Sequence, residues 1–550
     1  MSVDPVSELR DAVLAASAEL APDGERIALE EPRDPKLGDY STNAAMLLAR
    51  SAGEPPRQIA ERLRAGLEER LGSGVREIAV AGPGFINLFM SDRWYREAVR
   101  DVLAAERFGA PPGPDRDVNV ILEFVSANPT GPLTVASGRG AAYGDSLARV
   151  LELAGYSVTR EYYLNDAGSQ VRRFAESIAA RMRGEEPPEG GYTGAYVGEL
   201  ADELREAGVG PDDLDELAVR GVEAMRTRIQ ASLERFRVFF DVWSSERELH
   251  ERGAVEQTVA ELRERGHAYE QDGAIWLRTT EFGDDKDRVL VRSDGEPTYF
   301  AADVAYHRDK MARGAELMID PLGADHHGYV PRMKASLAAL GADPDRYEAP
   351  ILQLVQVVEG GERARMSKRK GEFVTLDELI DDIGVDAARF FLLQRSHDTP
   401  LEVDLELARS ESQDNPVYYA QYAHARIASI LRKAQEEGRD VSPEAIAADA
   451  SGALAMATEP SERALIRRVL ALPAEVAEAA QRRAPHRLCT YVTATAADFH
   501  AFYRDCRVVG ADEEAGTEGL EAARLAVCLA AKRTLATALA LIGCEAPERM

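Results

Sequence analysis

Apolar positions repeat along this chain in two patterns, and each pattern predicts a different kind of element. In residues 6–21 apolar side chains recur every three or four positions, which predicts an amphipathic helix. Residues 118–125 (VNVILEFV) form a mostly apolar run, as expected for a parallel strand buried on both faces. A loop with proline and glycine follows, and then a helical stretch from about 138 to 154. Strand, loop and helix in this order predict the opening of a doubly wound nucleotide-binding fold, whose ligand binds at the carboxyl ends of the strands.

Changes in the same pattern predict an α/β protein of three domains. Residues 1–110 form a small α/β domain with a Gly/Pro turn at 81–87, and the linker PPGP follows it. Residues 115–405 form a Rossmann-like domain with a helix-rich, polar insertion at about 170–270. Its later strands are expected at 274–277, 316–319 and 351–358.

The last 145 residues change character again. Residues 406–550 are almost entirely helical in pattern, and they predict an all-α domain. Its longest expected helices cover 417–436, 459–482 and 520–541.

The composition argues against membrane, secreted, disulfide-bonded and zinc-binding proteins. No run of about 18 apolar residues occurs, and the start of the chain lacks a basic segment followed by an apolar one. We therefore expect neither a membrane span nor a signal peptide. The four cysteines include no C-x-x-C pair, so we expect reduced thiols in the cytoplasm and no disulfide or zinc framework.

The net charge of −29 at first argues against a nucleic-acid partner, because phosphates attract lysine and arginine. The charge is unevenly placed, however. Residues 406–550 hold 17 basic and 21 acidic residues, a net charge of −4, so the first 405 residues carry −25. Arginines of the helical domain can still lie together on one face. The net charge therefore does not exclude a nucleic-acid partner, and the motifs are the better evidence.

The segment 123–139 (EFVSANPTGPLTVASGR) connects the predicted strand to its helix. It resembles the loop of class I arginyl-tRNA synthetases, which ends in a four-residue signature, usually His-x-Gly-His. In this chain the signature reads Thr134-Val-Ala-Ser137, so both histidines and the glycine are replaced. In that family the arginine carboxylate attacks the ATP α-phosphate, a reaction that requires hydrogen-bond donors and a helix N-terminus at the phosphates.

The resemblance implies roles for this loop. The hydroxyls of Thr134 and Ser137 are expected to take over the histidines' hydrogen bonds to phosphate, although a neutral donor is weaker than an imidazolium. The ATP-binding residues implied here are Pro129, Thr130, Ala136 and Gly138.

A second motif is the basic segment 365–371 (RMSKRKG). It resembles the mobile K-M-S-K-S loop of class I synthetases, and Lys368 matches the lysine that grips the triphosphate. Lys370 is a second candidate cation, and Met366 and Ser367 are expected to contact ATP. A solvated basic run is the alternative reading. Its position after one predicted strand and before a helix favours the synthetase loop.

Selection of arginine requires carboxylates and a flat partner for the guanidinium. The segment 294–310 (DGEPTYFAADVAYHRDK) resembles the family's arginine-pocket segment. Tyr299 and Asp303 are four residues apart, so on a helix they share a face, and the ring can stack while the carboxylate pairs. The other arginine-binding residues implied by resemblance are Glu123, Ser126, Asn128, Glu246 and His327.

The segment 323–329 (GADHHGY) allows two interpretations. Its aspartate and two histidines could suggest zinc, but adjacent residues rarely converge on one ion and no distant cluster completes a site. In the resembled family this segment lies beside adenine and arginine. We therefore expect Gly323, Asp325 and His326 to bind ATP, and we expect no protein-held metal.

The two ends of the chain point to RNA. Aromatic residues stand near arginine in 415–426 and 499–507, a combination that suits unstacked RNA bases. Both segments resemble the family's anticodon-binding bundle, although Tyr418 and Phe502 are expected to be core residues. Residues 37–43 and 81–87 resemble the appended domain that contacts the outer corner of tRNA.

Together these segments identify the chain as a member of the arginyl-tRNA synthetases. The resemblance implies joining of arginine to tRNA(Arg) with ATP and Mg²⁺, by a monomer. Two alternatives stay open from the sequence. The altered signature favours an impaired paralogue that binds tRNA as a regulator, and an ATP-dependent ligase with another arginine acceptor is the other possibility.

Overall fold

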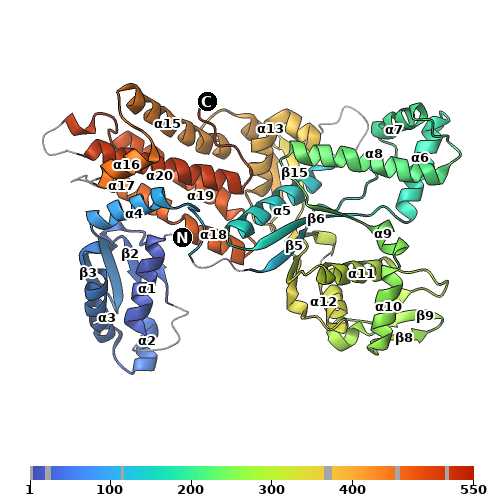
Figure 1. Cartoon of the computed structure of the whole chain (residues 1–550), viewed down its shortest axis with the longest axis horizontal. Helices are drawn as coiled ribbons and strands as arrows, with labels where there is room; N and C mark the ends of the chain where they lie inside the picture. Colours follow the sequence, from blue (N-terminus) through green and yellow to red (C-terminus); the bar gives the residue numbers. More distant parts are fainter. Residues whose placement is uncertain are drawn as a thin grey trace.

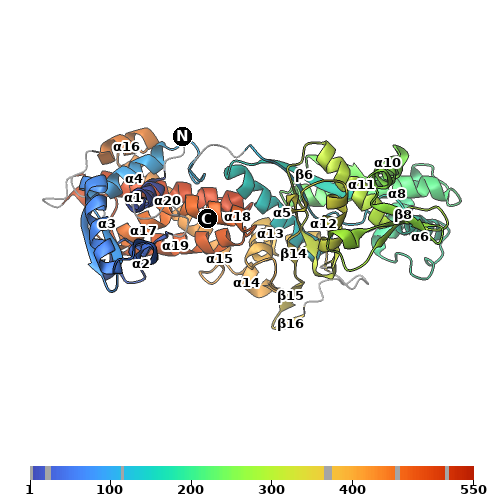
Figure 2. The ribbon, with the colours of Figure 1, turned by 90° about the horizontal axis from the view of Figure 1, so that it is seen from below.

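A computed structural model describes residues 4–18, 27–112, 117–326, 328–363, 374–451, 459–513 and 519–550. Helices and sheets form three consecutive parts along the chain (Figure 1). In both views the N-terminal part lies at one end against the C-terminal helices, and helices α6–α8 lie at the other end (Figure 2). None of the helices within these ranges is both long and apolar enough to cross a membrane.

The N-terminal part packs helices against a four-stranded antiparallel sheet of order β1-β2-β4-β3. Asp4 caps the first helix by accepting hydrogen bonds from the backbone N–H groups of Val6 and Ser7. The expected turn at 81–87 joins two paired strands. The elements are α1 (Pro5–Ser17), β1 (Leu29–Glu30), β2 (Tyr40–Thr42), α2 (Ala44–Ala52), α3 (Pro56–Leu71), β3 (Val75–Ala81), β4 (Phe85–Met90) and α4 (Asp92–Ala104).

The middle part is built on a five-stranded sheet of order β13-β11-β5-β6-β7, in which every neighbouring pair is parallel. The predicted opening unit is present as β5 (Asn119–Glu123) followed by α5 (Val135–Leu153). The apolar residues of β5 are buried, as a central strand with both faces covered requires. The other strands of this sheet are β6 (Ser157–Leu164), β7 (Val242–Ser245), β11 (Leu317–Ile319) and β13 (Tyr347–Glu348).

In the helix-rich segment expected at about 170–270, the first three helices share an apolar core of their own: α6 (Ser169–Met182), α7 (Ala195–Glu206) and α8 (Leu214–Arg235). It also contains β7, which joins the parallel sheet beside β6. The strand expected at 274–277 forms, but it lies in a separate antiparallel sheet of β8 (Ala268–Gln271), β9 (Ala274–Leu277) and β10 (Arg288–Val291). Apolar content alone predicts a strand and not the sheet that it joins.

The remaining elements of the middle part surround the sheet. The strand expected at 351–358 divides into β14 (Ile351–Leu352) and β15 (Val355–Glu359), which pair with different partners. Those partners are β12 (Leu322–Gly323) for β14 and, for β15, β16 (Glu362–Arg363) and β17 (Leu401–Asp404). The helices are α9 (Glu246–Glu251), α10 (Ala254–Glu264), α11 (Tyr299–Ala312), α12 (Tyr329–Ala339) and α13 (Leu376–Leu393).

Helices form the C-terminal part, as expected. The stretch expected at 459–482 is broken at Ala471, because Pro473 stands in the first turn of the next helix and cannot donate a backbone hydrogen bond. One buried apolar cluster runs from the N-terminal part through α5 into this bundle. The helices are α14 (Leu405–Arg409), α15 (Pro416–Glu436), α16 (Pro443–Ser451), α17 (Pro460–Leu470), α18 (Leu472–Gln481), α19 (Arg487–Asp505) and α20 (Leu520–Leu541).

Candidate active site

The carboxyl edge of the parallel sheet gathers the acidic residues that the sequence separates. Glu123 ends β5, Glu246 follows β7 directly, and Asp320 follows β11. Because β5, β6, β7 and β11 are parallel neighbours, these ends meet at one edge of the sheet. Open α/β sheets bind their ligands at this edge.

The loop after β5 begins with a strained backbone. Val125 and Ser126 have φ angles of 67° and 39°, in the left-handed region that favours glycine. The Ser126 hydroxyl donates to Glu123 Oε1 over 2.8 Å and accepts a hydrogen bond from the Tyr163 backbone N–H over 3.1 Å. Strain of this kind costs on the order of 1–3 kcal/mol per residue and persists where surrounding contacts fix it. These bonds fix Ser126 at the mouth of the site.

The four-residue signature forms the first turn of α5. Thr134 is the N-cap, and its hydroxyl oxygen accepts from the Ser137 backbone N–H over 3.3 Å. The two hydroxyl oxygens lie 3.3 Å apart, and Ala136 beside them is exposed. The positive end of the helix dipole lies here and attracts phosphate. The helix starts three residues before its expected beginning because threonine caps it.

Gly138 has a packing reason to be glycine. A Cβ at this position would lie 2.8 Å from Leu376 Cδ1, so α5 and α13 approach too closely for a side chain. Its contact with ATP stays a prediction. Pro129 and Thr130, in the loop before α5, are both buried.

The signature is hydrogen-bonded to the residues that directly follow the segment with the predicted lysines. Val135 N–H donates to the Val374 carbonyl over 3.1 Å, and Leu376 N–H donates to the Leu133 carbonyl over 2.8 Å. Lys368, Lys370, Met366 and Ser367 lie outside the described residues. Their segment ends at residue 373, immediately before this pairing.

The predicted arginine pocket is centred on α11. Tyr299 and Asp303 lie on this helix four residues apart, and the Tyr329 hydroxyl donates a hydrogen bond to Asp303 Oδ2. The Tyr299 ring is half exposed, and its hydroxyl lies close enough to Gly168 that a Cβ there would be 3.2 Å away. Tyr299 and Glu246 line one hollow of about 440 Å³. Asp303, one turn further along α11, does not line this hollow, so only Tyr299 of the predicted pair borders it.

Two carboxyl groups in this pocket have raised pKa values. Burial, with Asp303 and Asp166 nearby, raises the pKa of Glu246 to about 7. Burial also raises the pKa of Asp303 to about 6, with Glu123 and Asp320 adding to the shift. Glu246 Oε2 and the Tyr163 hydroxyl are buried, and neither forms a geometrically acceptable hydrogen bond with another described residue. A guanidinium placed here would satisfy these acids with charge and with several N–H donors.

A buried lysine behind this pocket is not among the residues predicted from the sequence. Lys310 is fully buried and donates to Glu123 Oε2 over 2.6 Å and to Asp320 Oδ1 over 2.8 Å. Burial would lower its pKa, but Asp320 and Glu123 outweigh that effect and raise it. His307 lies 2.8 Å from the other oxygen of Asp320. Lys310 is seven residues after Asp303 on α11, so its place on the same helix face was a usable signal.

Glu123 consequently differs from the other predicted pocket residues. Its two oxygens already accept from Lys310 and Ser126, so it supports the pocket wall whether or not it also reaches a substrate. Asn128 is exposed and donates to Gln170 Oε1 over 2.8 Å. His327 lies outside the described residues.

The segment after β12 borders the same region. Gly323, Asp325 and His326 are all exposed, and the His326 ring meets Tyr329 edge-on at 6.5 Å. Tyr329 is the partner of Asp303, so this segment adjoins the predicted pocket. Within the described residues, no three histidine, cysteine, aspartate or glutamate side chains group as metal ligands.

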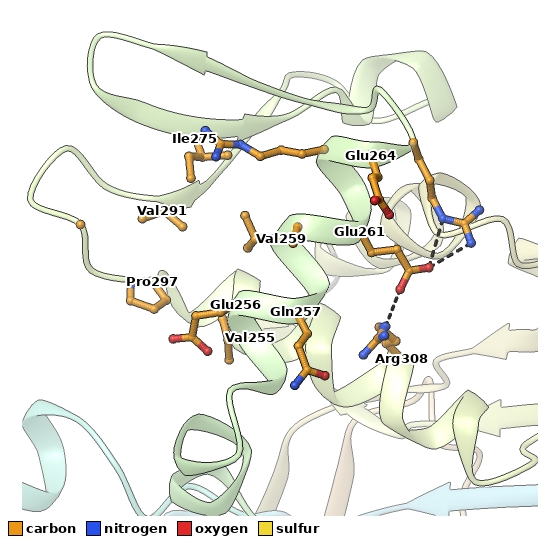
Figure 3. A pocket seen from close by; sticks show the side chains of 14 residues that line it. Val255, Glu256, Gln257, Val259, Glu261, Glu264, Ile275, Val291, Pro297 and Arg308 are labelled. Carbon is orange, nitrogen blue, oxygen red and sulfur yellow. Dashed lines mark hydrogen bonds and ion pairs between the residues drawn. The ribbon is translucent and has the colours of Figure 1, made fainter.

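Another hollow, of about 1280 Å³, lies between α10 and the β9–β10 hairpin (Figure 3). Apolar residues such as Val259 and Val291 line it. Its central carboxylate, Glu261, is already paired with Arg265 and Arg308. No predicted site residue lines this hollow, so its size does not make it the active site.

Aromatic residues and an arginine gather on α15 and α19 in the C-terminal bundle. Arg426 lies over the rings of Tyr422 and Tyr503 at 5.1 and 5.3 Å. Tyr418 stacks on Tyr422 and is only partly buried, so its interpretation as a core residue was wrong. Phe502 is fully buried, as expected. We call Tyr418, Tyr422, Arg426, His500 and Tyr503 the aromatic cluster.

Known proteins resemble the chain along its whole length. It matches "Arginyl tRNA synthetase N terminal domain" over residues 7–90, "tRNA synthetases class I (R), catalytic domain" over 98–186 and 201–429, and "DALR anticodon binding domain" over 420–550.

Individual relatives agree with these matches. The chain is 46% identical to the arginine–tRNA ligase of Frankia alni, with 99% of this chain and 100% of that protein covered. It is 47% identical to the corresponding ligase of Desulforudis audaxviator, with 98% and 97% covered. The solved arginyl-tRNA synthetase of Thermus thermophilus is similar in structure, with a TM-score of 0.77 and 25% identity over 98% of this chain and 99% of that one.

Proposed function

The chain belongs to the arginyl-tRNA synthetases, which are class I arginine–tRNA ligases, and we propose how its residues perform that reaction. Arginine and ATP form arginyl-adenylate and pyrophosphate, and the arginyl group then passes to the 3′ end of tRNA(Arg), releasing AMP. The observation that carries this proposal is the near-complete coverage of curated arginine–tRNA ligases at 46–47% identity.

The guanidinium of arginine binds beside α11, between the hollow lined by Tyr299 and Glu246 and the carboxylate of Asp303. Asp303 pairs with it, Glu246 supplies a second carboxylate and the Tyr299 ring covers one face. Ser126, Asn128 and Glu123 hold the polar end of the amino acid, together with His327. Two acids that share a dry pocket keep raised pKa values until a cation arrives, which favours arginine over neutral amino acids.

ATP lies across the loop after β5 and the first turn of α5. Thr134 and Ser137 donate hydrogen bonds to the phosphates from the N-terminus of α5, where the helix dipole adds to them. Lys368 and Lys370 bind the triphosphate from the segment that precedes Val374, whose carbonyl accepts a hydrogen bond from the Val135 N–H. The adenosine end contacts Pro129, Thr130, Ala136, Gly138, Gly323, Asp325, His326, Met366 and Ser367.

Magnesium accompanies ATP in this proposal. Mg²⁺ usually keeps several waters and takes substrate phosphates as ligands, so it requires no dedicated protein cage.

The tRNA spans the length of the chain. The aromatic cluster on α15 and α19 stacks with unpaired anticodon bases. Residues 37–43 of the N-terminal part contact the outer corner of the tRNA. One chain carries the amino-acid pocket, the phosphate site and the RNA-binding bundle, so it acts as a monomer. We place it in the cytoplasm, where its four free cysteines stay reduced.

No comparison supports the impaired paralogue that the altered signature allowed, because the similar proteins are themselves named as ligases. Nor does any support a different arginine acceptor, given the match to an anticodon-binding domain.

Substrate choice tests this function. Purified protein is supplied with ATP, tRNA(Arg) and either arginine or citrulline, which has a neutral group of nearly the same shape. We expect AMP and pyrophosphate to form with arginine and the rate with citrulline to be lower by at least about a hundredfold. Equal rates with the two amino acids would contradict the proposal that carboxylates in the pocket select arginine.

A further inference from the structure

The loop that carries Asn128 and Thr130 is held from two directions. From the sheet, the Tyr162 hydroxyl donates to the Ala127 carbonyl over 2.8 Å. From the helical insertion, the Tyr196 hydroxyl on α7 donates to the Thr130 carbonyl over 2.7 Å. Gln170 on α6 accepts the hydrogen bond from Asn128. Two of the insertion's helices therefore reach the substrate loop directly.

Tyr196 takes its position from the insertion and not from the loop. Its ring stacks on Phe174 with the centroids 6.5 Å apart, and Phe174 is fully buried in the apolar core of α6–α8. The loop backbone comes close to it, because a Cβ at Gly131 would lie 3.1 Å from the Tyr196 hydroxyl. The core of the insertion therefore fixes the position of Tyr196, and the loop backbone packs against its hydroxyl.

The loop requires such support. It leaves β5 through two residues with left-handed φ angles, Val125 and Ser126, a conformation that a free chain rarely adopts. If Tyr196 were truncated, the Thr130 carbonyl would lose its hydrogen bond. Because Thr130 is buried, water could not easily replace that bond.

We propose that Tyr196 is a positioning residue for ATP: it holds the Thr130 backbone where the nucleotide binds, although it lies outside the parallel sheet and does not touch substrate. The proposal rests on the ligase function above and assigns the helical insertion a part in nucleotide binding. The guanidinium of arginine is held from α11 and α9. Ser126 and Asn128, which hold its polar end, have side-chain hydrogen bonds of their own to Glu123 and Gln170, so the main effect falls on ATP.

The test compares Tyr196→Phe with Tyr192→Phe. Tyr192 meets the same Phe174 ring edge-on at 5.4 Å, so its variant removes a hydroxyl from the same core. Aminoacylation is measured in the full-length protein with ATP and arginine varied separately. A non-hydrolysable ATP analogue is titrated in parallel, and the melting temperature is recorded. We expect Tyr196→Phe to raise the KM for ATP about three- to tenfold, the effect of one lost neutral hydrogen bond.

Three further results are expected: a KM for arginine within about twofold of the parent value in Tyr196→Phe, parent values for both substrates in Tyr192→Phe, and similar melting temperatures in both variants. An unchanged KM for ATP in Tyr196→Phe would overturn the proposal, as would equal increases for ATP and arginine or the same increase in Tyr192→Phe. Failure of the parent to charge tRNA would contradict the ligase function instead. The analogue titration would then still compare the two variants.

Discussion

At the scale of single residues, Asp303 carries the selection of arginine. It lies on α11 with Tyr329 donating to one oxygen, which leaves the other for a guanidinium. Asp303→Asn keeps the shape and removes the charge, so a bound guanidinium loses its pair in a largely dry pocket. We expect kcat/KM for arginine to fall by roughly 2–4 kcal/mol, measured by aminoacylation. Asp345→Asn, at an exposed surface pair with Lys334, is the matched control and should have no effect.

The raised pKa values predict a pH dependence of arginine binding. Below its pKa a carboxyl is protonated and cannot pair with a guanidinium, and the values here are about 6 for Asp303 and about 7 for Glu246. The KM for arginine should therefore rise as pH falls from about 8 to about 6. Because the cation favours the ionised acids, binding near pH 6.5 should release protons. Calorimetry in two buffers of different ionisation enthalpy measures that release, and its absence in the parent would count against a carboxylate pocket.

The residues predicted from sequence depend on local spacing, whereas the missed residue depends on contacts between distant strands. Tyr299 and Asp303 could be placed on one helix face because four-residue spacing is local. Lys310 could not be paired in advance, because its partners Glu123 and Asp320 lie at the ends of two other strands. Such pairing depends on strand order, which the spacing of residues along the chain does not determine.

At the scale of elements, the N-terminus of α5 decides whether the altered signature works. Ser137→Ala removes one hydroxyl without removing the helix cap, since Thr134 is the N-cap. If that hydroxyl binds phosphate in the transition state, kcat should fall at least about tenfold with little change in the KM for arginine.

Thr134 requires a paired comparison because it also caps α5. Thr134→Val removes both cap and donor, and it should also cost about 1 kcal/mol of unfolding free energy. Thr134→Ser keeps both and should retain most of the parent kcat. Parent-like kcat in both Ser137→Ala and Thr134→Val would remove these hydroxyls from the chemistry.

Helices, strands and turns were predicted correctly where a local sequence pattern alone determines them. The strand β5 and the helix α20 lie where the apolar pattern places them, and the predicted Gly/Pro turn lies between β3 and β4. It failed where topology decides: β9 pairs with β8 and β10 and not with the main sheet. Apolar periodicity predicts the start of α5 three residues too late, because the helix begins at its cap, Thr134, which is not an apolar residue.

At the scale of the whole molecule, an acidic protein has to bind RNA. The net charge is −29, yet Arg426 and its neighbouring rings lie together on the bundle. Tyr503→Ala removes a half-exposed ring from this cluster and should weaken tRNA(Arg) binding by about 1–3 kcal/mol, the usual contribution of one base stack. Tyr269→Ala, which removes the ring of a similar pair with Arg278 outside the bundle, serves as control. Filter binding at several salt concentrations gives the affinities, which should fall as salt rises. Equal losses in the two variants would mean that the cluster does not read RNA.

The most direct measurement is the extent to which the purified parent chain charges tRNA(Arg). The protein is incubated with ATP, magnesium, labelled arginine and tRNA, and the arginine attached to RNA is counted at the plateau. We predict charging of most of the tRNA(Arg), none of a tRNA for another amino acid, and none when periodate has oxidised the tRNA 3′ end. If the protein binds tRNA(Arg) but does not charge it, the proposed ligase activity is contradicted. An impaired paralogue that only binds tRNA would then be the better explanation.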